Sequence, residues 1–562
     1  MPAIDYSRFY RHDELMALLR AFAAEQPDYV DVESIGRSHE GRDIPLVTLT
    51  NRATGAAMDK PAYWLDGNIH SVELTASTAC LYFVDWMLKG KDTDADIRRA
   101  LDTRAFYVCP RINPDGAEWA LADRPKYVRS STRRYPFDEE PLEGLVSEDI
   151  DGDGRILQMR IADPHGPWKT HPRQPQLLVR RDPLDPPGGD YYRVLPEGRV
   201  ENYDGVSIRV TGSAQGLDLN RNFPSNWRQE HEQLGAGPYP TSEPEVRAIV
   251  EFIARHPNIC GGTSLHTFSG VLLRPFGHLP DDKMPAEDLW TYEKLGKIGE
   301  QLTGYPAISI WHEFQYYPGE FITGAFDWIY EHLGMFMWTI EIWNPKKEAG
   351  IDNDEWIHWY RDHPIEDDLK MYDWAQRIAP GEGHVEWKPF DHPQLGRLEI
   401  GGWNRMALFS NPPPALRQKE VARFPKWLLS LALVSPKLEV RAAEVTRAGA
   451  DTWRVRLVVQ NSGWLPSYVS KMAVKHKVLR GVLAEISLPS GASLASGKPR
   501  EELGELEGWA YMHTGVSFWP NRTPTGDRAH VDWIVRAPAG TEIGLTAWHD
   551  RAGRVSTRVV LG

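Results

Sequence analysis

The chain has 562 residues, which is too long for a single compact core, so we expect about two to four domains. Its composition, 41% hydrophobic and 25% charged residues, is that of an ordinary globular protein and excludes a mostly disordered chain. The formal net charge is -14 and no dense run of Lys or Arg occurs, which excludes an electrostatic site for nucleic acid and favours a solvated acidic surface.

The N-terminal sequence and the cysteines predict a cytoplasmic protein. The opening MPAIDYSRFYRHDELMALLRAF carries charges where a signal peptide needs an uninterrupted apolar core, and no later stretch reaches membrane-spanning length. We therefore expect no membrane partner. The cysteines, Cys80, Cys109 and Cys260, form no close pair in the sequence, so we expect reduced thiols rather than a disulfide framework.

The first 116 residues alternate between helical and strand patterns. An amphipathic helix is predicted first, because leucines and Phe22 recur at helical spacing. Short apolar runs and a further helical pattern follow, and the last run ends in the turn residues NPDG. This alternation predicts an α/β fold with a twisted sheet flanked by helices. The predicted elements are a helix at 13–24, strands at 43–51 and 62–70, a helix at 75–88 and a strand at 104–116.

Two regions depart from this alternation. Between about 117 and 215 the periodicity is lost and Pro, Arg and Asp are frequent, which predicts an insertion of ordered loops. The alternation resumes with a helix predicted at 241–256 and lasts to about Trp343. The segment 345–434 is mixed, with Trp-rich helical pieces and an apolar helix at 424–434.

The pattern of apolar and polar residues changes again after Pro436. LEVRAAEV, TWRVRLVVQN and VDWIVRAP alternate apolar and polar residues and are separated by Gly and Pro turns, which predicts a C-terminal all-β sandwich. We therefore expect an α/β domain over residues 1–434, with the insertion and a C-terminal extension, and a β-sandwich domain over 435–562.

The stretch WLDGNIHSVELTAS places His70 and Glu73 three residues apart, after a strand and at the start of a helix. In open α/β sheets ligands bind at the carboxyl ends of strands, so both side chains can hold a metal there. The spacing alone is weak evidence, since His363 and Glu366 repeat it. A catalytic zinc needs a third protein ligand, and His266 in GGTSLHTFSG can supply it, although alone it could equally be a core histidine.

Two further stretches carry polar residues that suit a zinc hydrolase. FMWTIEIWN buries Glu341 among apolar residues, where it would act as general base beside a zinc site or, alternatively, belong to a buried ion pair. In GLDLNRNFPSNW, Arg221 beside Asn220 can bind a carboxylate, and Asp218 can orient a liganding imidazole. Each of these loop residues could instead be solvated.

Six motifs in order, HSVE, NPDG, DLNRNF, SEPEV, SLHTFSG and TIEIW, resemble those of the zinc metallocarboxypeptidase family, the M14 or carboxypeptidase A type. The early IGRSHEGRDIPLVTLT is also similar to the first strands of that family. The resemblance covers roughly residues 5 to 345 apart from the insertion. It implies a Zn²⁺ site formed by His70, Glu73 and His266, with Asp218 behind a histidine ligand and Glu341 as general base.

The resemblance also implies a peptide substrate with a free C-terminal carboxylate. Asn220 and Arg221 match the pair that grips this carboxylate, and Arg129 in YVRSS matches the arginine that stabilises the oxyanion. Phe326, directly before Asp-Trp, matches a position in the specificity pocket and implies an apolar C-terminal side chain.

One family feature has no direct match. The substrate-binding tyrosine should lie a few residues before GAFDW; Tyr316 and Tyr317 are near but need a shifted loop, and Tyr317 is our assignment. Only 69 residues precede His70, and predicted strands occupy them, so we expect no pro-domain.

A second metal is a separate hypothesis. EDIDGDGRILQMR places Asp149, Asp151 and Asp153 at alternate positions before Gly154, as in the first half of a calcium-binding EF-hand loop. The position of the bidentate Glu is Arg160, which excludes a normal EF-hand. Either the loop binds Ca²⁺ with other ligands or it is an Asp-Gly turn without metal.

The sequence is therefore compatible with three functions. The first is a zinc carboxypeptidase. The second is a zinc amidohydrolase of N-acyl amino acids, which also carry a carboxylate. The third is a non-catalytic peptide-binding protein, against which the complete set of three ligands and Glu341 counts.

Overall fold

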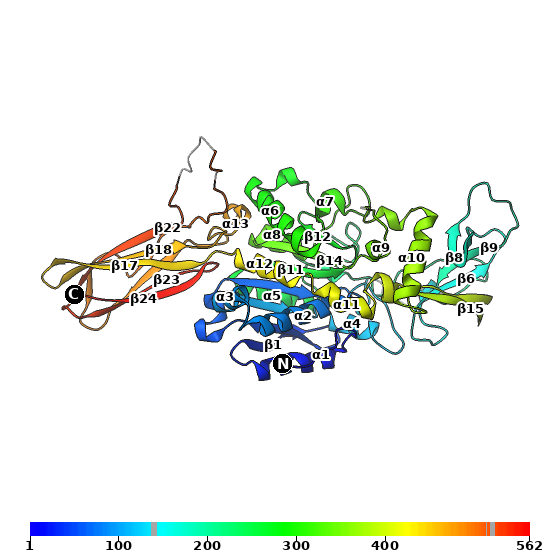
Figure 1. Cartoon of the computed structure of the whole chain (residues 1–562), viewed down its shortest axis with the longest axis horizontal. Coiled ribbons are helices and arrows are strands. Elements are labelled where there is room, and N and C mark those ends of the chain that lie inside the picture. The colour runs from blue at the N-terminus through cyan, green and yellow to red at the C-terminus, as the bar shows by residue number, and fades with distance from the viewer. Residues whose placement is uncertain (137–142, 354, 513, 517–522) are drawn as a thin grey trace.

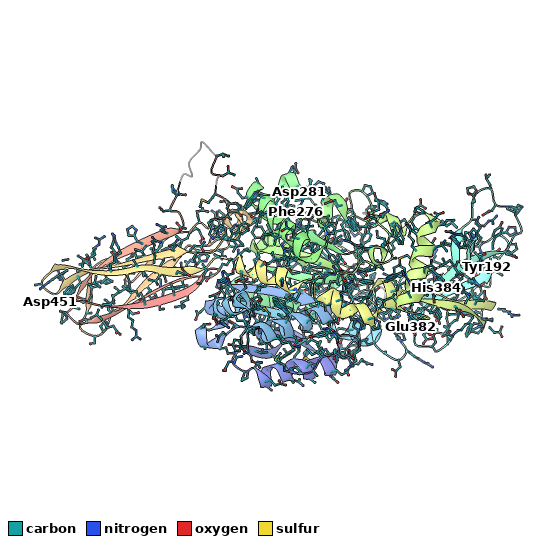
Figure 2. All side chains as sticks on the ribbon, viewed as in Figure 1. Tyr192, Phe276, Asp281, Glu382, His384 and Asp451 are labelled. Atoms are coloured by element: carbon teal, nitrogen blue, oxygen red, sulfur yellow. The ribbon has the colours of Figure 1, made fainter. Side chains whose placement is uncertain are left out.

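The computed structural model describes residues 1–136, 143–353, 355–512, 514–516 and 523–562. The chain forms three parts in a row: a central body, a β-sandwich near the C-terminus, and a smaller sheet at the opposite end (Figure 1). Asp451 marks the outer end of the sandwich, and Tyr192 and His384 mark the smaller sheet (Figure 2). No helix among the described residues is both long and apolar enough to cross a membrane.

The central body contains an eight-stranded mixed sheet in the order β1-β2-β4-β3-β11-β14-β12-β13. Strands β4, β3, β11 and β14 are parallel neighbours, so their carboxyl ends meet at one end of the sheet. The strands β2, β3 and β4 confirm the predicted ones. The bounds are β1 Val30–Arg37, β2 Asp43–Leu49, β3 Ala62–Gly67, β4 Ala105–Cys109, β11 Ile259–Thr267, β12 Val271–Arg274, β13 Ala307–Ser309 and β14 Phe336–Ile342.

Helices cover both faces of this sheet, because successive strand residues point to opposite faces. Tyr63 and Leu65 join the apolar core under α2, α6 and α12, whereas Trp64 joins the core under α5 and α8. The helices α1, α2, α5 and α12 confirm predicted ones, and the NPDG turn begins a short helix, α4. The bounds are α1 His12–Glu25, α2 Leu74–Gly90, α3 Ala95–Thr103, α4 Pro114–Ala120, α5 Pro244–Arg255, α6 Ala286–Thr303, α7 Ile310–Glu313, α8 Ala325–Leu333 and α12 Pro425–Leu433.

The predicted insertion of loops was wrong in its local structure. Four of its strands combine with β15 and β16 of the segment 345–434 into one antiparallel sheet, in the order β15-β16-β6-β9-β7-β8. Ile400 of β16 pairs with Met159 of β6, and both are buried in a separate apolar cluster. A strand whose partner lies far along the chain leaves little local signal. The bounds are β6 Gln158–Ala162, β7 Trp168–His171, β8 Gln174–Arg180, β9 Tyr191–Pro196, β15 His384–His392 and β16 Gly396–Trp403.

The insertion and the extension contain a few further elements. Strands β5 and β10 pair with each other near the start and end of the insertion. Helix α10 contributes Met371 and Trp374 to the main apolar core. The bounds are β5 Gly144–Ser147, β10 Gly198–Glu201, α9 Pro345–Glu348, α10 Ile365–Ile378 and α11 Pro414–Val421.

The C-terminal part confirms the predicted β-sandwich. Two four-stranded antiparallel sheets, β17-β18-β22-β20 and β21-β19-β23-β24, enclose a core to which Trp453, Val455 and Leu457 contribute at alternate positions of β18. The bounds are β17 Leu438–Gly449, β18 Thr452–Asn461, β19 Leu483–Ser487, β20 Ser493–Ser496, β21 Arg500–Glu502, β22 Arg528–Arg536, β23 Glu542–His549, β24 Gly553–Val560 and a connecting helix, α13 Lys471–His476.

Hydrogen bonds with buried partners join the sandwich to the central body. Arg551 is 2% exposed and donates from Nη1 to the carbonyl of Gly334, 2.9 Å away, at the end of α8. Asp288 of α6 accepts from the backbone nitrogens of Lys471 and Met472 at 2.7 and 3.0 Å. These contacts suit a sandwich that braces the central body.

Candidate functional site

The polar residues predicted to hold a metal lie where the parallel strands end. His70 and Glu73 occupy the loop after β3, and His266 is near the end of β11. Asn68 takes the left-handed conformation, with φ of 59°, and its Nδ2 donates to the carbonyl of His70 at 2.8 Å. The turn brings Glu73 to the amino end of α2, where the helix dipole favours a carboxylate.

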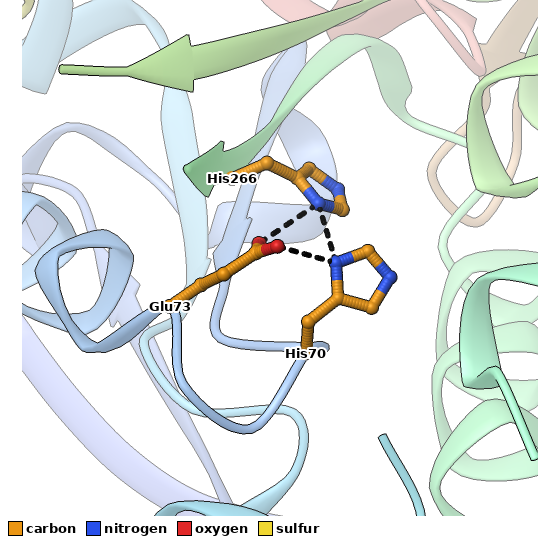
Figure 3. A group of neighbouring side chains, drawn as sticks. All are labelled: His70, Glu73 and His266. Atoms are coloured by element: carbon orange, nitrogen blue, oxygen red, sulfur yellow. Dashed lines mark hydrogen bonds and ion pairs between the residues drawn. The ribbon is translucent and has the colours of Figure 1, made fainter. Parts of the chain in front are cut away.

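The three side chains converge on one point (Figure 3). Nδ1 of His70 lies 2.9 Å from Oε1 of Glu73, and Nδ1 of His266 lies 3.1 Å from Oε2 of the same carboxylate. The two Nδ1 atoms are 3.1 Å apart. All three residues are buried, at 3%, 4% and 2% exposure for His70, Glu73 and His266.

The Nε2 atoms of the two imidazoles, the nitrogens that face away from the cluster, have oxygen partners. His70 Nε2 lies 3.2 Å from Oδ1 of Asp218, and His266 Nε2 lies 3.2 Å from Oγ of Ser264. The Ser264 hydroxyl donates to Asp66, so its oxygen accepts from His266. This pattern assigns a proton to each Nε2 and leaves each Nδ1 with a free lone pair.

The donor set fits a zinc ion. With the protons on Nε2, two nitrogen lone pairs and a carboxylate face one another without a proton between them, which is unfavourable in a buried site unless a cation joins them. Two nitrogens and one carboxylate match a catalytic zinc site, which keeps a fourth position open, and ligand distances of about 2.0–2.1 Å are compatible with nitrogens this close.

Glu341 lies beside this cluster on the neighbouring strand. It is the register partner of His266 in the parallel pair of β11 and β14. The other six positions of β14 are buried, whereas Glu341 is partly exposed. Burial, and secondarily Glu73, raise the pKa of Glu341 to about 8, although His266 and Arg129 oppose the shift. A carboxylate that is the register partner of His266, and partly exposed, is placed to accept a proton beside the metal site.

Arg129 faces the same cluster and is accessible. Its Nε donates to Oδ2 of Asp218 at 3.0 Å, its Nη1 lies 3.5 Å from Glu73, and the side chain is 46% exposed. The loop is held against the metal-binding turn, since the backbone nitrogen of Ser71 donates to the carbonyl of Arg129 at 3.1 Å. Burial would raise the pKa of Asp218, but Arg129, Arg221 and His70 outweigh it and hold the pKa well below its usual value.

Asn220 and Arg221 follow Asp218 in a short 3₁₀ turn. Oδ1 of Asn220 accepts from the backbone nitrogen of Ala325 at 3.0 Å, which leaves the amide NH₂ group as a donor. Nη1 of Arg221 lies 3.9 Å from Oδ2 of Asp218. One carboxylate therefore ties Arg129 and Arg221 to the histidine side of the site.

The comparisons with known proteins agree with this geometry. The family model described as zinc carboxypeptidase matches residues 15–176 and 178–359, which is more than half of the chain. The chain belongs to the zinc carboxypeptidase family. Its members are peptide hydrolases. A second model, a domain of unknown function (DUF8731), matches residues 437–560.

Individual zinc carboxypeptidases are distant relatives. Carboxypeptidase B of Astacus astacus is 26% identical over 292 residues, covering 51% of this chain and 72% of the relative. Carboxypeptidase A1 of Rattus norvegicus is 21% identical over 347 residues, covering 60% of this chain and 64% of the relative, slightly under two thirds of its length. The crystal structure of carboxypeptidase A from Helicoverpa armigera matches with 18% identity and a TM-score of 0.39, covering 67% and 76% of the two chains.

Of the two tyrosines considered for substrate binding, Tyr316 rather than Tyr317 lies near the site. The pKa of Tyr316 is raised, first by burial, and the charges of Arg129, Glu341, Arg221 and Glu73 act on its hydroxyl. Tyr317 is 60% exposed, and the structure gives its side chain no contact with the site residues. The assignment of Tyr317 stays a prediction, and Tyr316 is the tyrosine of this pair on which the charges of the site act.

Phe326 is part of the protein core. Its side chain is 4% exposed and packs in the apolar cluster that also holds Ile322 and Trp328. Gly324 lies close to both Phe326 and Asn220, since a Cβ at this glycine would meet Oδ1 and the carbonyl of Asn220 as well as the ring of Phe326. Phe326 can therefore back a substrate subsite, while its own surface is covered.

The other metal-like patterns in the sequence lie apart from this cluster. His363 uses Nδ1 to contact the carbonyl of Trp359 at 2.7 Å and Nε2 to contact Asp368 at 3.2 Å, so the repeated spacing is accidental.

In the acidic loop, Asp149 and Asp151 lie near the buried carboxylate of Glu197, while Asp153 pairs with Arg155. Asp149 accepts from Gly152 and Gly154, and these bonds hold the turn without an ion. Calcium binding stays an untested hypothesis.

A third cluster, His278 with Asp327 and Glu331, is an ion-pair triad. His278 Nδ1 lies 3.7 Å from Oδ1 of Asp327, and Nε2 lies 3.4 Å from Oε1 of Glu331. Burial lowers the pKa of His278, but the two carboxylates outweigh burial and raise it to about 9. Because the two ring nitrogens face different carboxylates, the cationic imidazole itself links them.

This triad predicts a pH dependence of stability. A histidine whose folded pKa is raised stabilises the fold fully below its unfolded pKa of about 6.5 and loses this contribution as pH rises through about 9. Asp327, with a pKa of about 6, titrates below that window. We expect the thermal midpoint of the native protein to fall more between about pH 7 and about pH 10 than that of His278→Gln. Equal falls would contradict the triad's role.

One residue near the site escaped sequence reasoning altogether. Arg405, in the extension beyond the family match, interacts electrostatically with Arg129, Glu73 and Tyr316. A single arginine more than sixty residues after Glu341 carries no motif, so no local signal could have identified it.

Proposed function

We propose that this protein is a zinc-dependent metallocarboxypeptidase that removes the C-terminal residue of peptides. The observation that carries the proposal is the convergence of His70 Nδ1, His266 Nδ1 and the Glu73 carboxylate beside Glu341. Family membership supports the reaction class and the metal.

The residues of the site have separable tasks in this reaction. Zinc held by His70, Glu73 and His266 would supply a Lewis acid that polarises the scissile carbonyl and makes water more acidic. Glu341 accepts a proton from the attacking water and then passes it to the leaving amine. The accessible guanidinium of Arg129 donates to the carbonyl oxygen as negative charge develops there.

Selection of the chain end falls to Asn220 and Arg221. The amide NH₂ of Asn220 and the guanidinium of Arg221 are donors that suit a terminal carboxylate. The ring of Phe326 reaches Gly324 beside Asn220, and this apolar backing supports a preference for apolar C-terminal side chains. An N-acyl amino acid carries the same carboxylate and is the alternative substrate class.

The test compares short peptides ending in Phe with a free or an amidated C-terminus. We expect the zinc-loaded protein to release Phe only from the free form. Losing a charge-assisted hydrogen bond costs about 1.5–3 kcal/mol, so Arg221→Gln should lower the ratio of kcat/KM for free over amidated peptide by about 10- to 100-fold. Arg255→Gln, an exposed arginine at the end of α5, is the matched control.

Several outcomes would contradict the proposal. Equal cleavage of both peptides would remove the role of the carboxylate-binding pair. Hydrolysis of acetyl-Phe with no cleavage of either peptide would move the function to the amidohydrolases. Binding of zinc and of peptide without any hydrolysis would leave a binding protein.

A further inference from the structure

A short segment of the extension lies against the metal-binding loops. Residues Arg405–Phe409 form one turn of π-helix after β16, and Asn404 begins it by accepting from the backbone nitrogen of Ala407. The segment lies outside the residues matched by the zinc carboxypeptidase model. π-Helical turns occur frequently at functional sites, so the contacts of this one are informative.

Asn411 fastens the segment to the loop that carries His70 and Glu73. Its Oδ1 accepts from the backbone nitrogen and the hydroxyl of Thr75 at 3.0 and 2.8 Å. Its Nδ2 donates to the carbonyl of Val72 at 2.9 Å, and Asn411 is fully buried. The extension therefore contacts residues within two positions of His70 and of Glu73.

The segment after Glu341 also contacts the π-turn directly, and the segment after His266 reaches it through Tyr360. Trp343, two residues after Glu341, donates from its indole to the carbonyl of Leu408 at 2.8 Å. Phe268, two residues after His266, packs edge-on against Tyr360, which packs edge-on against Phe409. Two direct contacts with catalytic segments, and a third through Tyr360, hold the π-turn in place.

Arg405 is the first residue of this turn, and its positive charge lacks a hydrogen-bonded or ion-paired partner among the described residues. Its side chain is exposed and makes no hydrogen bond or ion pair with any residue that the structure describes. The groups whose charges act on it are Arg129, Glu73 and Tyr316, and its guanidinium stays charged beside them. Arg129 already has Asp218 and Glu73 as partners, so Arg405 has no carboxylate of its own.

We propose that Arg405 forms a subsite for an acidic side chain of the peptide substrate, on the N-terminal side of the scissile bond. An unpaired guanidinium held close to a catalytic centre gains most from an anionic ligand. The groups whose charges act on Arg405 are the metal ligand Glu73, the proposed oxyanion arginine Arg129, and Tyr316, and neither Asn220 nor Arg221 is among them. A peptide with its carboxylate on that pair therefore runs past the metal toward Arg405. This proposal rests on the proposed function.

The test varies the residue before the scissile bond. The peptides acetyl-Gly-Glu-Phe, acetyl-Gly-Gln-Phe and acetyl-Gly-Lys-Phe are hydrolysed by the native protein, Arg405→Gln and Arg405→Glu. We expect the native protein to prefer Glu over Gln by about tenfold in kcat/KM, Arg405→Gln to bring this ratio near one, and Arg405→Glu to favour Lys. Arg397→Gln, an exposed arginine of β16 on the same hairpin, should keep the native ratio.

A second readout does not need hydrolysis. Calorimetry measures binding of the Glu and Gln peptides to zinc-loaded Glu341→Gln, with and without Arg405→Gln, and we expect tighter binding of the Glu peptide only where Arg405 is present. A ratio that Arg405→Gln leaves unchanged, or an equal loss for all three peptides, would overturn the subsite. If the native protein cleaves none of the peptides, the proposed function fails, and the binding ratio still decides the subsite.

Discussion

Glu341→Gln is expected to lower kcat for a peptide ending in Phe by about a thousandfold while the protein still binds one zinc ion. Glutamine keeps the size and hydrogen-bonding reach of glutamate but cannot accept the proton of the attacking water, and general-base catalysis contributes about 10²- to 10⁴-fold. Glu341 is the register partner of His266 on the neighbouring strand. In the part of the chain that the structure describes, it makes no hydrogen bond with Nδ1 of His70 or of His266, so zinc binding should not depend on it.

The metal content and the rate are measured on the same preparation. Glu386→Gln, an exposed glutamate on β15, is the control for the loss of one negative charge and should keep the native rate. A Glu341→Gln enzyme with more than about a tenth of the native kcat would show that another group activates the water. Loss of zinc in this variant would instead make Glu341 a metal ligand.

His266→Ala is expected to weaken zinc binding by more than about 100-fold, because changes at outer-shell partners of ligands alone cost about 10- to 100-fold. Glu73 and His70 would remain, but two ligands leave the ion incompletely held. Zinc should raise the thermal midpoint of the native protein, since a ligand that binds only the folded state stabilises it, and should leave the variant unchanged.

Two further variants should give zinc affinities equal to that of the native protein and intermediate between native and His266→Ala. His363→Ala removes the histidine with the same sequence spacing to a glutamate and should keep the native zinc affinity, because His363 contacts Trp359 and Asp368 instead. Asp218→Asn should fall between the two, since Asp218 contacts the outer nitrogen of His70. Native zinc affinity in His266→Ala would refute the ligand set.

The metal cluster was implied by the family resemblance, which rests on several short motifs in order, whereas the spacing of His70 and Glu73 alone was weak evidence. His70 and Glu73 follow an apolar strand and open a helix, and the structure places them there. His266 and Glu341 lie in apolar runs that form β11 and β14, and a sheet with parallel neighbours brings their carboxyl ends together.

The remaining substrate residues depended on loops, for which local pattern is a weak guide. The charges of the site act on Tyr316 in the loop before α8, and Phe326 in the first turn of α8 is buried in the core. The roles inferred from the family resemblance for Arg129, Asn220 and Arg221 stay predictions, although Asp218 links the two arginines to His70.

By itself the sequence determined the α/β sheet, the β-sandwich and the residues able to bind zinc, because apolar periodicity and short motifs act over a few residues. Only the tertiary structure decided that the insertion and the extension share one sheet and that Asn411 fastens the π-turn to the loop of His70 and Glu73. The physical reason is that these contacts join segments far apart along the chain. Their hydrogen bonds and packing depend on the whole fold and leave no periodic trace in either segment.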